Sequence, residues 1–250
     1  MTKMGKSIKT SNRIKISIII PAYNEESRMK SFLEEIMSFC KSKLKNYELI
    51  FVDDGSKDDT KKIFERFKSR NSNIQLISYS PNHGKGYAVK KGIFAARGEY
   101  VLFIDIDGSI QPKEIPKMLQ MLKKYPVVVG SRALASSNVK QSLLRKMTSS
   151  LFNPYVNFLF HNKVNDHLCG FKGFHKEIAK QLFKDLINER WLFDVELFYK
   201  IRKRKIRFYE QPIDWIHKED SKMKFIDPLK MLYELIYIRI QLASRLRKYK

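Results

Sequence analysis

The stretch EYVLFIDIDGS, residues 99–109, decides the fold class of this 250-residue chain. Its first part, Glu99–Asp105, is interpreted as a strand because aliphatic and aromatic residues follow one another without interruption. The strand then runs into aspartates and a glycine, which are common turn residues. The sequence on either side shows which kind of sheet this strand joins.

Strand-like and helix-like stretches alternate along the first half of the chain. The strand-like runs are Ile16–Ala22, Tyr47–Asp53, Ile74–Ser80, Glu99–Asp105 and Pro126–Ser131. Helical spacing is found over Ser27–Ser42, Asp58–Ser69, Lys85–Arg97 and Pro112–Lys124. This order predicts an α/β fold with a mostly parallel central sheet, flanked by helices. Ligands of such sheets bind beyond the carboxyl ends of the strands.

The pattern loosens after about residue 135. We expect helices over Leu143–Phe160, Val195–Arg204 and Pro228–Leu246, and a short strand over Ile206–Pro212. The predicted organisation is a flexible basic tail (residues 1–13), one α/β domain (14–225) and a C-terminal amphipathic helix (226–250).

The formal net charge of +23 implies an anionic partner, namely nucleic acid, an acidic membrane surface or phosphorylated substrates. Two cysteines make no disulfide framework, so a reducing cytosolic compartment is the simpler expectation. We see no apolar leader in residues 1–15, and no apolar run approaches the roughly 20 residues that span a bilayer.

Asp105 and Asp107 are the strongest candidate functional residues. Residues two apart on an extended segment point to the same side, so both carboxylates can face one cation. Mg²⁺ is commonly held by one or two carboxylates together with substrate phosphates. The alternative is an Asx turn that caps a helix. The position directly after a hydrophobic strand favours a metal site for a nucleoside diphosphate.

Polar turns follow two other strands. Asp53 either contacts a ribose or base, or caps the following turn. Gly84 and Lys85 either let the backbone and an ammonium approach a phosphate, or form a flexible loop before a helix. The spacing fits neither a P-loop nor a dinucleotide-binding fingerprint, which argues against a kinase or a dehydrogenase.

The motifs together resemble the family 2 inverting glycosyltransferases, which have the GT-A fold. They are SIIIPAYNEE, FVDDGSKDDT, GKGYAVKKGI, ARGEYVLFIDIDGS and VVVGSRA. In the second half, NDHLCGFKGF, RWLFDVEL and WIHKEDSK are similar to polyprenyl-phosphate glycosyltransferases, above all those that glucosylate dolichyl phosphate, with the mannosyl enzymes next. The resemblance covers residues 14–225, which it identifies as a GT-A catalytic domain.

The resemblance implies a role for each matching position. The nucleoside pocket is expected to contain Pro21, Tyr23, Glu25 and Asp53. Asp105 and Asp107 are expected to bind Mg²⁺ or Mn²⁺ and the sugar diphosphate, with Gly84 and Lys85 close to it. Phosphate groups are expected to face Arg132 and Arg145, with Asp166 beside the sugar or acceptor and Lys222 closing over the site.

One position departs from the family pattern. The mannosyl branch has a metal-binding glutamine two residues after the second aspartate, where this chain has Ser109. Metal coordination would then rely on the two aspartates, phosphates and water. Because an acceptor phosphate monoester is already an anion, Asp166 is expected to orient it first and to act as a base only second. Asp166 could equally serve a capping or salt-bridging role.

The expected partners are UDP-glucose or GDP-mannose as donor, polyprenyl or dolichyl phosphate as acceptor, and an anionic membrane surface. We expect peripheral association with the cytosolic face of a membrane through 143–160 and 228–246, helped by the basic run 202–205. The alternative is that both helices cover the sheet. The competing interpretations are a saccharide or protein acceptor, a nucleotidyltransferase and a nucleic-acid-binding module. We expect no nucleic-acid partner, because no nucleic-acid recognition motif accompanies the positive charge.

Overall fold

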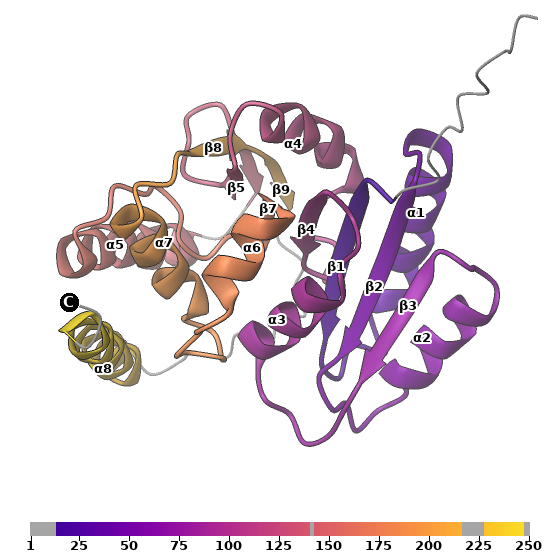
Figure 1. Ribbon diagram of the computed structural model, residues 1–250, viewed down its shortest axis with the longest axis horizontal. Helices are drawn as coiled ribbons and strands as arrows, with labels where there is room; N and C mark the ends of the chain where they lie inside the picture. Colours follow the sequence, from indigo (N-terminus) through magenta and orange to yellow (C-terminus); the bar gives the residue numbers. More distant parts are fainter. Residues whose placement is uncertain (1–13, 141–142, 217–227, 248–250) are drawn as a thin grey trace, which may run out of the picture.

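The computed structural model describes residues 14–140, 143–216 and 228–247, and the side chains of 14–139, 151–216 and 233–244. One sheet of seven strands runs through the molecule in the order β3-β2-β1-β4-β7-β5-β8 (Figure 1). These strands are β1 (Ile16–Ala22), β2 (Tyr47–Asp53), β3 (Ile74–Ser78), β4 (Tyr100–Ile104), β5 (Val127–Ser131), β7 (Phe171–His175) and β8 (Phe208–Pro212). A second, two-stranded sheet pairs β6 (Asn138–Lys140) with β9 (Asp214–Ile216).

The strand directions place six carboxyl ends at one edge of the large sheet. β1 is parallel to β2 and β4, β2 to β3, and β5 to β8. Only β7 runs the other way, antiparallel to both of its neighbours β4 and β5. The mostly parallel sheet predicted from the sequence is therefore confirmed. Because β7 is reversed, the segment that leads into it starts at the edge where β4 and β5 end.

Helices cover both faces of the sheet. The first face packs on α1 (Met29–Lys43), α2 (Thr60–Ser69), η1 (Pro112–Glu114) and α4 (Ile115–Leu122). The second face packs on α3 (Lys85–Ala95), α6 (Lys176–Phe183) and α7 (Phe193–Lys203). Successive strand residues point to opposite faces, so Ile18 and Ile20 enter the first core and Ile19 enters the second. The uninterrupted apolar strands follow from burial on both faces.

A third apolar cluster lies outside the sheet. The helices α5 (Leu143–Phe160) and α8 (Pro228–Arg247) pack together against α7. The cluster includes Leu235, Ile238 and Leu242 of α8, all of them buried. In the part of the chain that the structure describes, no helix combines the length and the apolarity that crossing a bilayer requires.

The sequence analysis missed β7, α6 and the two short strands β6 and β9. The β7 stretch, FKGFH, contains a lysine and a glycine and lacks the β-branched run that marks the other strands. Lys172 is nevertheless buried in the middle of the sheet. Its burial depends on partners elsewhere in the chain, which no local pattern can reveal.

Candidate active site

The two candidate metal ligands lie directly after β4. The backbone amide of Asp105 donates to the carbonyl of Gly170, 3.0 Å away, which fixes the end of β4 against the segment before β7. Asp107 accepts a hydrogen bond from the amide of Ser109 at 2.9 Å. The Asx turn considered as an alternative therefore does form, through one carboxylate oxygen. A turn of this kind orients Asp107 and is compatible with a metal-binding role.

Lys85 lies against the first aspartate. Its ammonium is 2.6 Å from Oδ1 of Asp105 and 2.8 Å from Oδ2. Lys85 is the first residue of α3 and follows Gly84, whose φ of 107° disfavours any other residue. A Cβ on Gly84 would also approach the carbonyl oxygen of Glu189 to 2.8 Å. The glycine thus lets α3 begin close to the segment before α7 and brings Lys85 to the end of β4.

The charges around this pair favour a further cation. Burial lowers the pKa of Lys85, but the negative charges of Asp105 and Asp194 outweigh it and the pKa is raised. The pKa of Asp105 is raised by burial and by the charge of Asp107, against the opposing effect of Lys85. Lys85 pairs with Asp105, and Asp107 adds a second carboxylate beside it. Neighbouring carboxylates of this kind favour a divalent cation.

The chemistry of the donor set also fits a magnesium-type site. Within the described ranges, no group of three or more Asp, Glu, His or Cys side chains converges on one point. The protein therefore offers the pair Asp105 and Asp107, and the remaining positions are left to phosphate oxygens and water. Mg²⁺ is usually bound in this manner, with one or two carboxylates beside substrate phosphates.

The turn after β2 is organised by two aspartates. Asp53 is buried and accepts hydrogen bonds from the amide of Ser56 at 3.0 Å and the hydroxyl of Ser78 at 2.9 Å. Asp54 accepts from the amide of Gly84 at 2.8 Å, which ties this turn to the start of α3. Asp54 is thus a scaffold residue, and the capping alternative considered for Asp53 applies. A nucleoside contact of Asp53 remains a prediction.

The expected nucleoside-pocket residues lie around the end of β1. Pro21 is buried inside β1, opposite Val52, and Tyr23 is half-buried just beyond the strand. The carboxylate of Glu25 pairs with the guanidinium of Arg28, with Oε1 and Nη2 2.8 Å apart. The negative charges of Asp107 and Asp105 add to the effect of Glu25 in raising the pKa of Arg28. Arg28, which the sequence analysis did not single out, therefore belongs to the same charged region.

Arg132 and Asp166 form the second charged centre. Asp166 accepts from the amide, Nε and Nη2 of Arg132 at 3.0, 2.7 and 2.8 Å. Despite burial, the charge and hydrogen bonds of Arg132 lower the pKa of Asp166 to about 2. The guanidinium also lies over the ring of Trp215, 5.5 Å from its centroid. The salt-bridging role considered for Asp166 is therefore real, and it holds Arg132 in one orientation.

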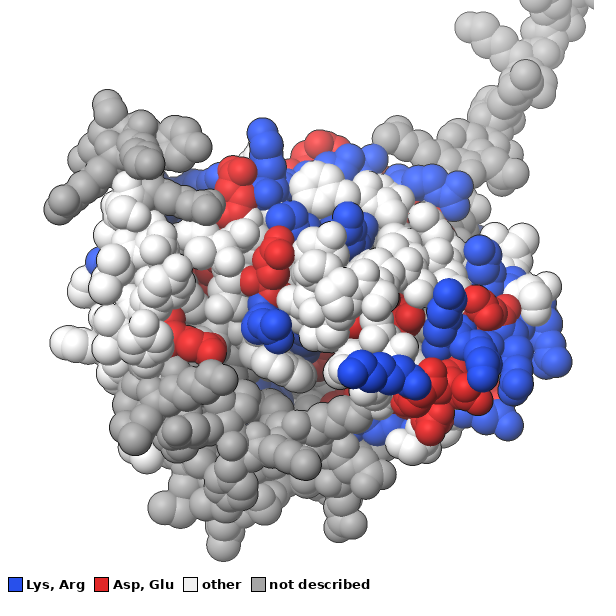
Figure 2. All heavy atoms as spheres, turned by 90° about the horizontal axis from the view of Figure 1, so that it is seen from below, with Lys and Arg blue, Asp and Glu red and all other residues white. Residues whose placement is uncertain are grey.

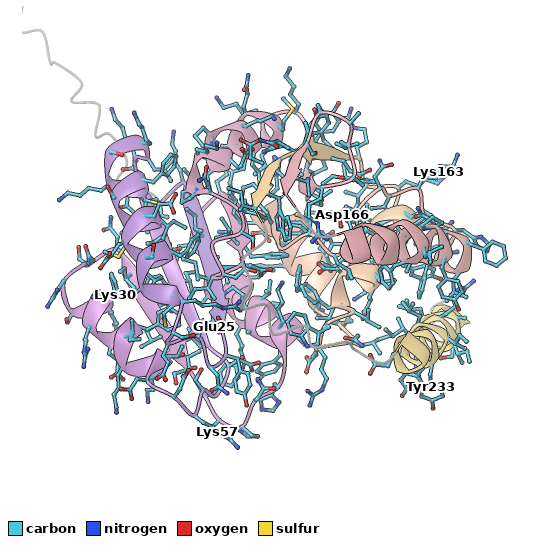
Figure 3. All side chains as sticks on the ribbon, turned by 180° about the vertical axis from the view of Figure 1, so that it is seen from behind. Glu25, Lys30, Lys57, Lys163, Asp166 and Tyr233 are labelled. Carbon is cyan, nitrogen blue, oxygen red and sulfur yellow. The ribbon has the colours of Figure 1, made fainter. Side chains whose placement is uncertain are left out.

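Asp166 belongs to a short segment whose side chains point in different directions. Figure 3 shows Asp166 in the interior of the molecule, whereas Lys163, three residues earlier, points outward. The same figure shows Glu25 on the opposite half of the molecule. Arg145 lies in α5 with its side chain outside the described residues, and Lys222 lies outside them altogether.

Figure 2 looks onto the molecule from the side on which the parallel strands end. Among the residues that the structure describes, Lys and Arg side chains on this face are interspersed with Asp, Glu and uncharged residues.

The comparison with protein families decides the assignment. The model of "Glycosyl transferase family 2" matches residues 17–183. The chain belongs to glycosyl transferase family 2. As a member of this family it is a glycosyltransferase, and the fold and enzyme class expected from its motifs are confirmed.

Curated relatives match this family 2 glycosyltransferase over almost its whole length. A dolichyl-phosphate beta-glucosyltransferase of Dictyostelium discoideum is 36% identical over 96% of this chain and 78% of its own. The human protein of the same name is 36% identical over 94% and 78%, and the Saccharomyces cerevisiae protein is 33% identical over 90% and 74%.

Solved structures with the same fold are more distant in sequence. Glucosyl-3-phosphoglycerate synthase from Mycobacterium tuberculosis, in complex with Mg²⁺ and UDP, has a TM-score of 0.66 at 18% identity and covers 91% of this chain and 79% of its own. A Pyrobaculum calidifontis mannosyltransferase in complex with GDP-mannose and Mn²⁺ has a TM-score of 0.57 at 17% identity, over 84% and 59%. At these identities the likeness concerns the GT-A fold alone.

Proposed function

We propose that this glycosyltransferase transfers glucose from UDP-glucose to dolichyl phosphate, with inversion at the sugar carbon, in a reaction that depends on Mg²⁺ or Mn²⁺. The observation that carries the proposal is the near full-length similarity to relatives named dolichyl-phosphate beta-glucosyltransferase. GDP-mannose with the same acceptor is the second candidate. Two separate charged centres support the proposal, the Lys85–Asp105 pair and the Arg132–Asp166 pair.

The donor half of the site is assigned to the end of β4. Asp105 and Asp107 would hold the divalent cation, with Ser109 fixing the turn rather than coordinating. When bound, the cation neutralises the charge that develops on the departing diphosphate. The Lys85 ammonium, now on Asp105, lies close enough to bind a diphosphate oxygen once the cation shares that carboxylate. The nucleoside is assigned to Pro21, Tyr23, Glu25 and Asp53.

The acceptor half is assigned to Arg132 and, in α5, Arg145. A phosphate monoester carries about −1.5 to −2 charges at neutral pH and is already a nucleophile. The protein must therefore bring two anions together, and an arginine does so by bidentate contact. Asp166 is a poor general base, because its pKa of about 2 keeps it deprotonated but weakly basic. We therefore assign it the role of orienting Arg132.

We also propose that the enzyme works at the cytosolic face of a membrane, docked through α8 and α5. α8 buries one face against α5 and α7, yet it exposes Tyr233, Ile236, Tyr237 and Ile240 on the other. The spacing of three, four and seven residues puts these side chains in one stripe. Tyr233 points away from the molecule in Figure 3. The alternative weighed from the sequence was that this helix covers the sheet, whereas α8 packs on the helices α5 and α7 with one face and leaves the other face to meet lipid.

The decisive experiment is transfer of labelled sugar from UDP-glucose, GDP-mannose and related donors to a short polyprenyl phosphate, with Mg²⁺, Mn²⁺ or EDTA. We expect a metal-dependent lipid product with UDP-glucose. Lipid product from GDP-mannose alone would transfer the proposal to the second donor. Hydrolysis of a donor without lipid product would point to a saccharide or protein acceptor.

A further inference from the structure

The side chain of Lys172 is almost completely enclosed, with 1% of its surface exposed. It stands in β7, between β4 and β5, and in the strand register it lies opposite Phe103 on one side and Val129 on the other. Its ammonium is 5.6 Å from the ring centroids of both Phe103 and Phe198. A lysine is almost never buried at such a place without partners that use its charge.

Lys172 has three partners. Its Nζ is 2.8 Å from Oδ1 of Asp194, and it donates to the carbonyls of Cys169 at 2.7 Å and His167 at 3.2 Å. The ammonium therefore has two backbone carbonyls as hydrogen-bond acceptors and one carboxylate as its counter-charge. Asp194 is equally enclosed, with 3% of its side chain exposed, and stands in the first turn of α7. Lys172 thus fastens the start of α7 to the segment before β7.

That segment, residues 166–170, carries a contact to each half of the site. At one end, Asp166 holds the guanidinium of Arg132. At the other end, the carbonyl of Gly170 receives the amide of Asp105, and a Cβ on Gly170 would lie 1.8 Å from an oxygen of the Asp105 carboxylate. A displacement of this segment would therefore disturb its contacts with Arg132 and Asp105. Lys172 donates hydrogen bonds to the middle of the segment, at the carbonyls of His167 and Cys169.

Asp194 is connected to the donor half in a second way. The segment just before α7 accepts hydrogen bonds from the start of α3: the amide of Gly86 donates to the carbonyl of Arg190, and that of Tyr87 to the carbonyl of Glu189. The ammonium of Lys85 lies 5.7 Å from the ring centroid of Trp191. The position of α7 therefore affects Lys85 as well as Lys172.

We propose that the buried Lys172–Asp194 ion pair is a positioning device, which sets the distance between the donor half around Asp105 and the acceptor half around Arg132. This inference rests on the proposed transfer between two anionic substrates. Burying an ion pair is a poor way to gain stability, because well-packed apolar side chains in its place are often as stabilising or more so. Transfer rates are very sensitive to the orientation of the reacting groups, and an ion pair that fixes this orientation would explain the buried charges.

The test separates positioning from stability. Lys172→Met alone leaves the Asp194 carboxylate buried without its cation, so we expect a lower Tm and lower activity. In the double variant Lys172→Met with Asp194→Leu, both charges are gone and the new side chains lie among Phe103 and Phe198. We expect its Tm to recover. We also expect kcat to stay at least tenfold below wild type and UDP to bind at least fivefold more weakly in the presence of Mn²⁺.

A double variant with recovered Tm and with kcat and UDP affinity within twofold of wild type would overturn the proposal. If the double variant does not fold, Asp194→Asn, which keeps the shape of the side chain, is measured instead. It is judged by the same two quantities, kcat and UDP affinity, at a temperature at which it is folded.

The control is an ion pair with one buried partner. Glu48 is 1% exposed and pairs at 2.7 Å with Arg97, which is 66% exposed, near the opposite edge of the sheet, where β2 begins. Glu48→Gln should lower Tm and leave kcat and UDP affinity unchanged. A control that loses activity in parallel with Tm would mean that stability alone governs the effect. If the wild-type enzyme transfers no sugar to lipid, the proposed acceptor fails, but the UDP affinities still decide whether the pair positions the donor half.

Discussion

The ammonium of Lys85 touches both carboxylate oxygens of Asp105, at 2.6 and 2.8 Å. A cation of the protein thus occupies the side chain that is proposed to bind the metal. A divalent ion can bind Asp105 only if Lys85 moves or shares the carboxylate. Because the phosphates of the donor offer Lys85 a new partner, binding of metal and donor should be mutually supportive.

Lys85→Met removes the competing cation. We expect Mn²⁺ to bind the donor-free variant about tenfold more tightly than wild type, a gain of about 1.4 kcal/mol. UDP should bind more weakly, because the ammonium that would hold its phosphates is lost. Isothermal titration calorimetry with Mn²⁺ alone, and then with UDP in saturating Mn²⁺, measures the two effects separately.

Lys90→Met is the control for that experiment. Lys90 lies in the same helix and pairs with Glu189 at 2.9 Å, so its loss removes an equal charge without touching Asp105. Its Mn²⁺ affinity should stay within twofold of wild type. Equal gains in Lys85→Met and Lys90→Met would show a general effect of net charge, and weaker Mn²⁺ binding in Lys85→Met would contradict competition.

Asp107→Asn tests the metal site with little change in shape. The side chain is half-buried and retains an oxygen that can accept from Ser109, so Tm should stay within about 2 °C, as for other changes outside the core. With one of two protein carboxylates lost, we expect transfer to fall at least about a hundredfold. Initial rates across a Mn²⁺ series measure the loss; a rate near that of wild type would remove Asp107 from the site.

Gly170→Ala should damage the donor half through a single methyl group. The added Cβ would meet the Asp105 carboxylate at 1.8 Å, far inside van der Waals contact, so the carboxylate must turn away. We expect Mn²⁺ affinity to fall at least about tenfold, roughly the effect of losing one ligand or its support. Titration with Mn²⁺ followed by electron paramagnetic resonance gives the affinity.

The control for Gly170→Ala lies three residues later. In Gly173→Ala the new Cβ would meet Sδ of Met118 at 2.7 Å, the end of a flexible side chain on α4. That variant should lose stability, by about 1–3 kcal/mol as overpacked cores do, but bind Mn²⁺ normally. If both variants lose Mn²⁺ affinity equally, the effect of Gly170→Ala is a general loss of folding.

The first half of the fold could be predicted because its information is local. The strands β1 to β5 are rich in aliphatic and aromatic residues, and the polar turns after β1, β2 and β4 had to meet at one edge once the strands were parallel. The candidate metal pair Asp105 and Asp107 followed from this rule.

Lys172 and Asp194 could not be predicted in this way. Their pairing joins a strand to a helix that begins about twenty residues later, and each partner alone looks like an ordinary surface residue. The same holds for the Lys85–Asp105 pair: the sequence assigned both residues to the site, but only the folded chain shows that one neutralises the other.

His167 should make stability depend on pH. Burial, and then the charge of Lys172, lower its pKa from 6.5 to about 4, while its Nδ1 lies 3.0 Å from Oδ1 of Asn153. Between pH 4 and pH 6.5 His167 is protonated in the unfolded chain but stays neutral in the folded chain. The stabilisation is therefore complete above pH 6.5 and declines as pH falls to 4, by about 3 kcal/mol.

His167→Gln removes the titrating group. The fall in unfolding free energy between pH 7 and pH 4 should be smaller in this variant by about 3 kcal/mol, whatever its stability at pH 7. Urea denaturation at a series of pH values measures this difference. Parallel curves for the variant and the wild type would mean that His167 is not held neutral in the folded state.

The exposed stripe of α8 should bind anionic membranes. Ile236 and Ile240 are 46% and 60% exposed, on the face opposite the buried Leu235 and Ile238, and α8 lies toward the side of the molecule on which the parallel strands end (Figure 1). Burying apolar side chains in lipid and attracting basic residues to anionic headgroups both contribute to binding.

The double variant Ile236→Glu with Ile240→Glu should bind phosphatidylserine-containing vesicles at least about tenfold more weakly. Phe94→Glu, at a 47% exposed apolar residue of α3, should bind as wild type does. Co-sedimentation at rising salt measures both, and equal binding by all three proteins would show that α8 is not the docking surface.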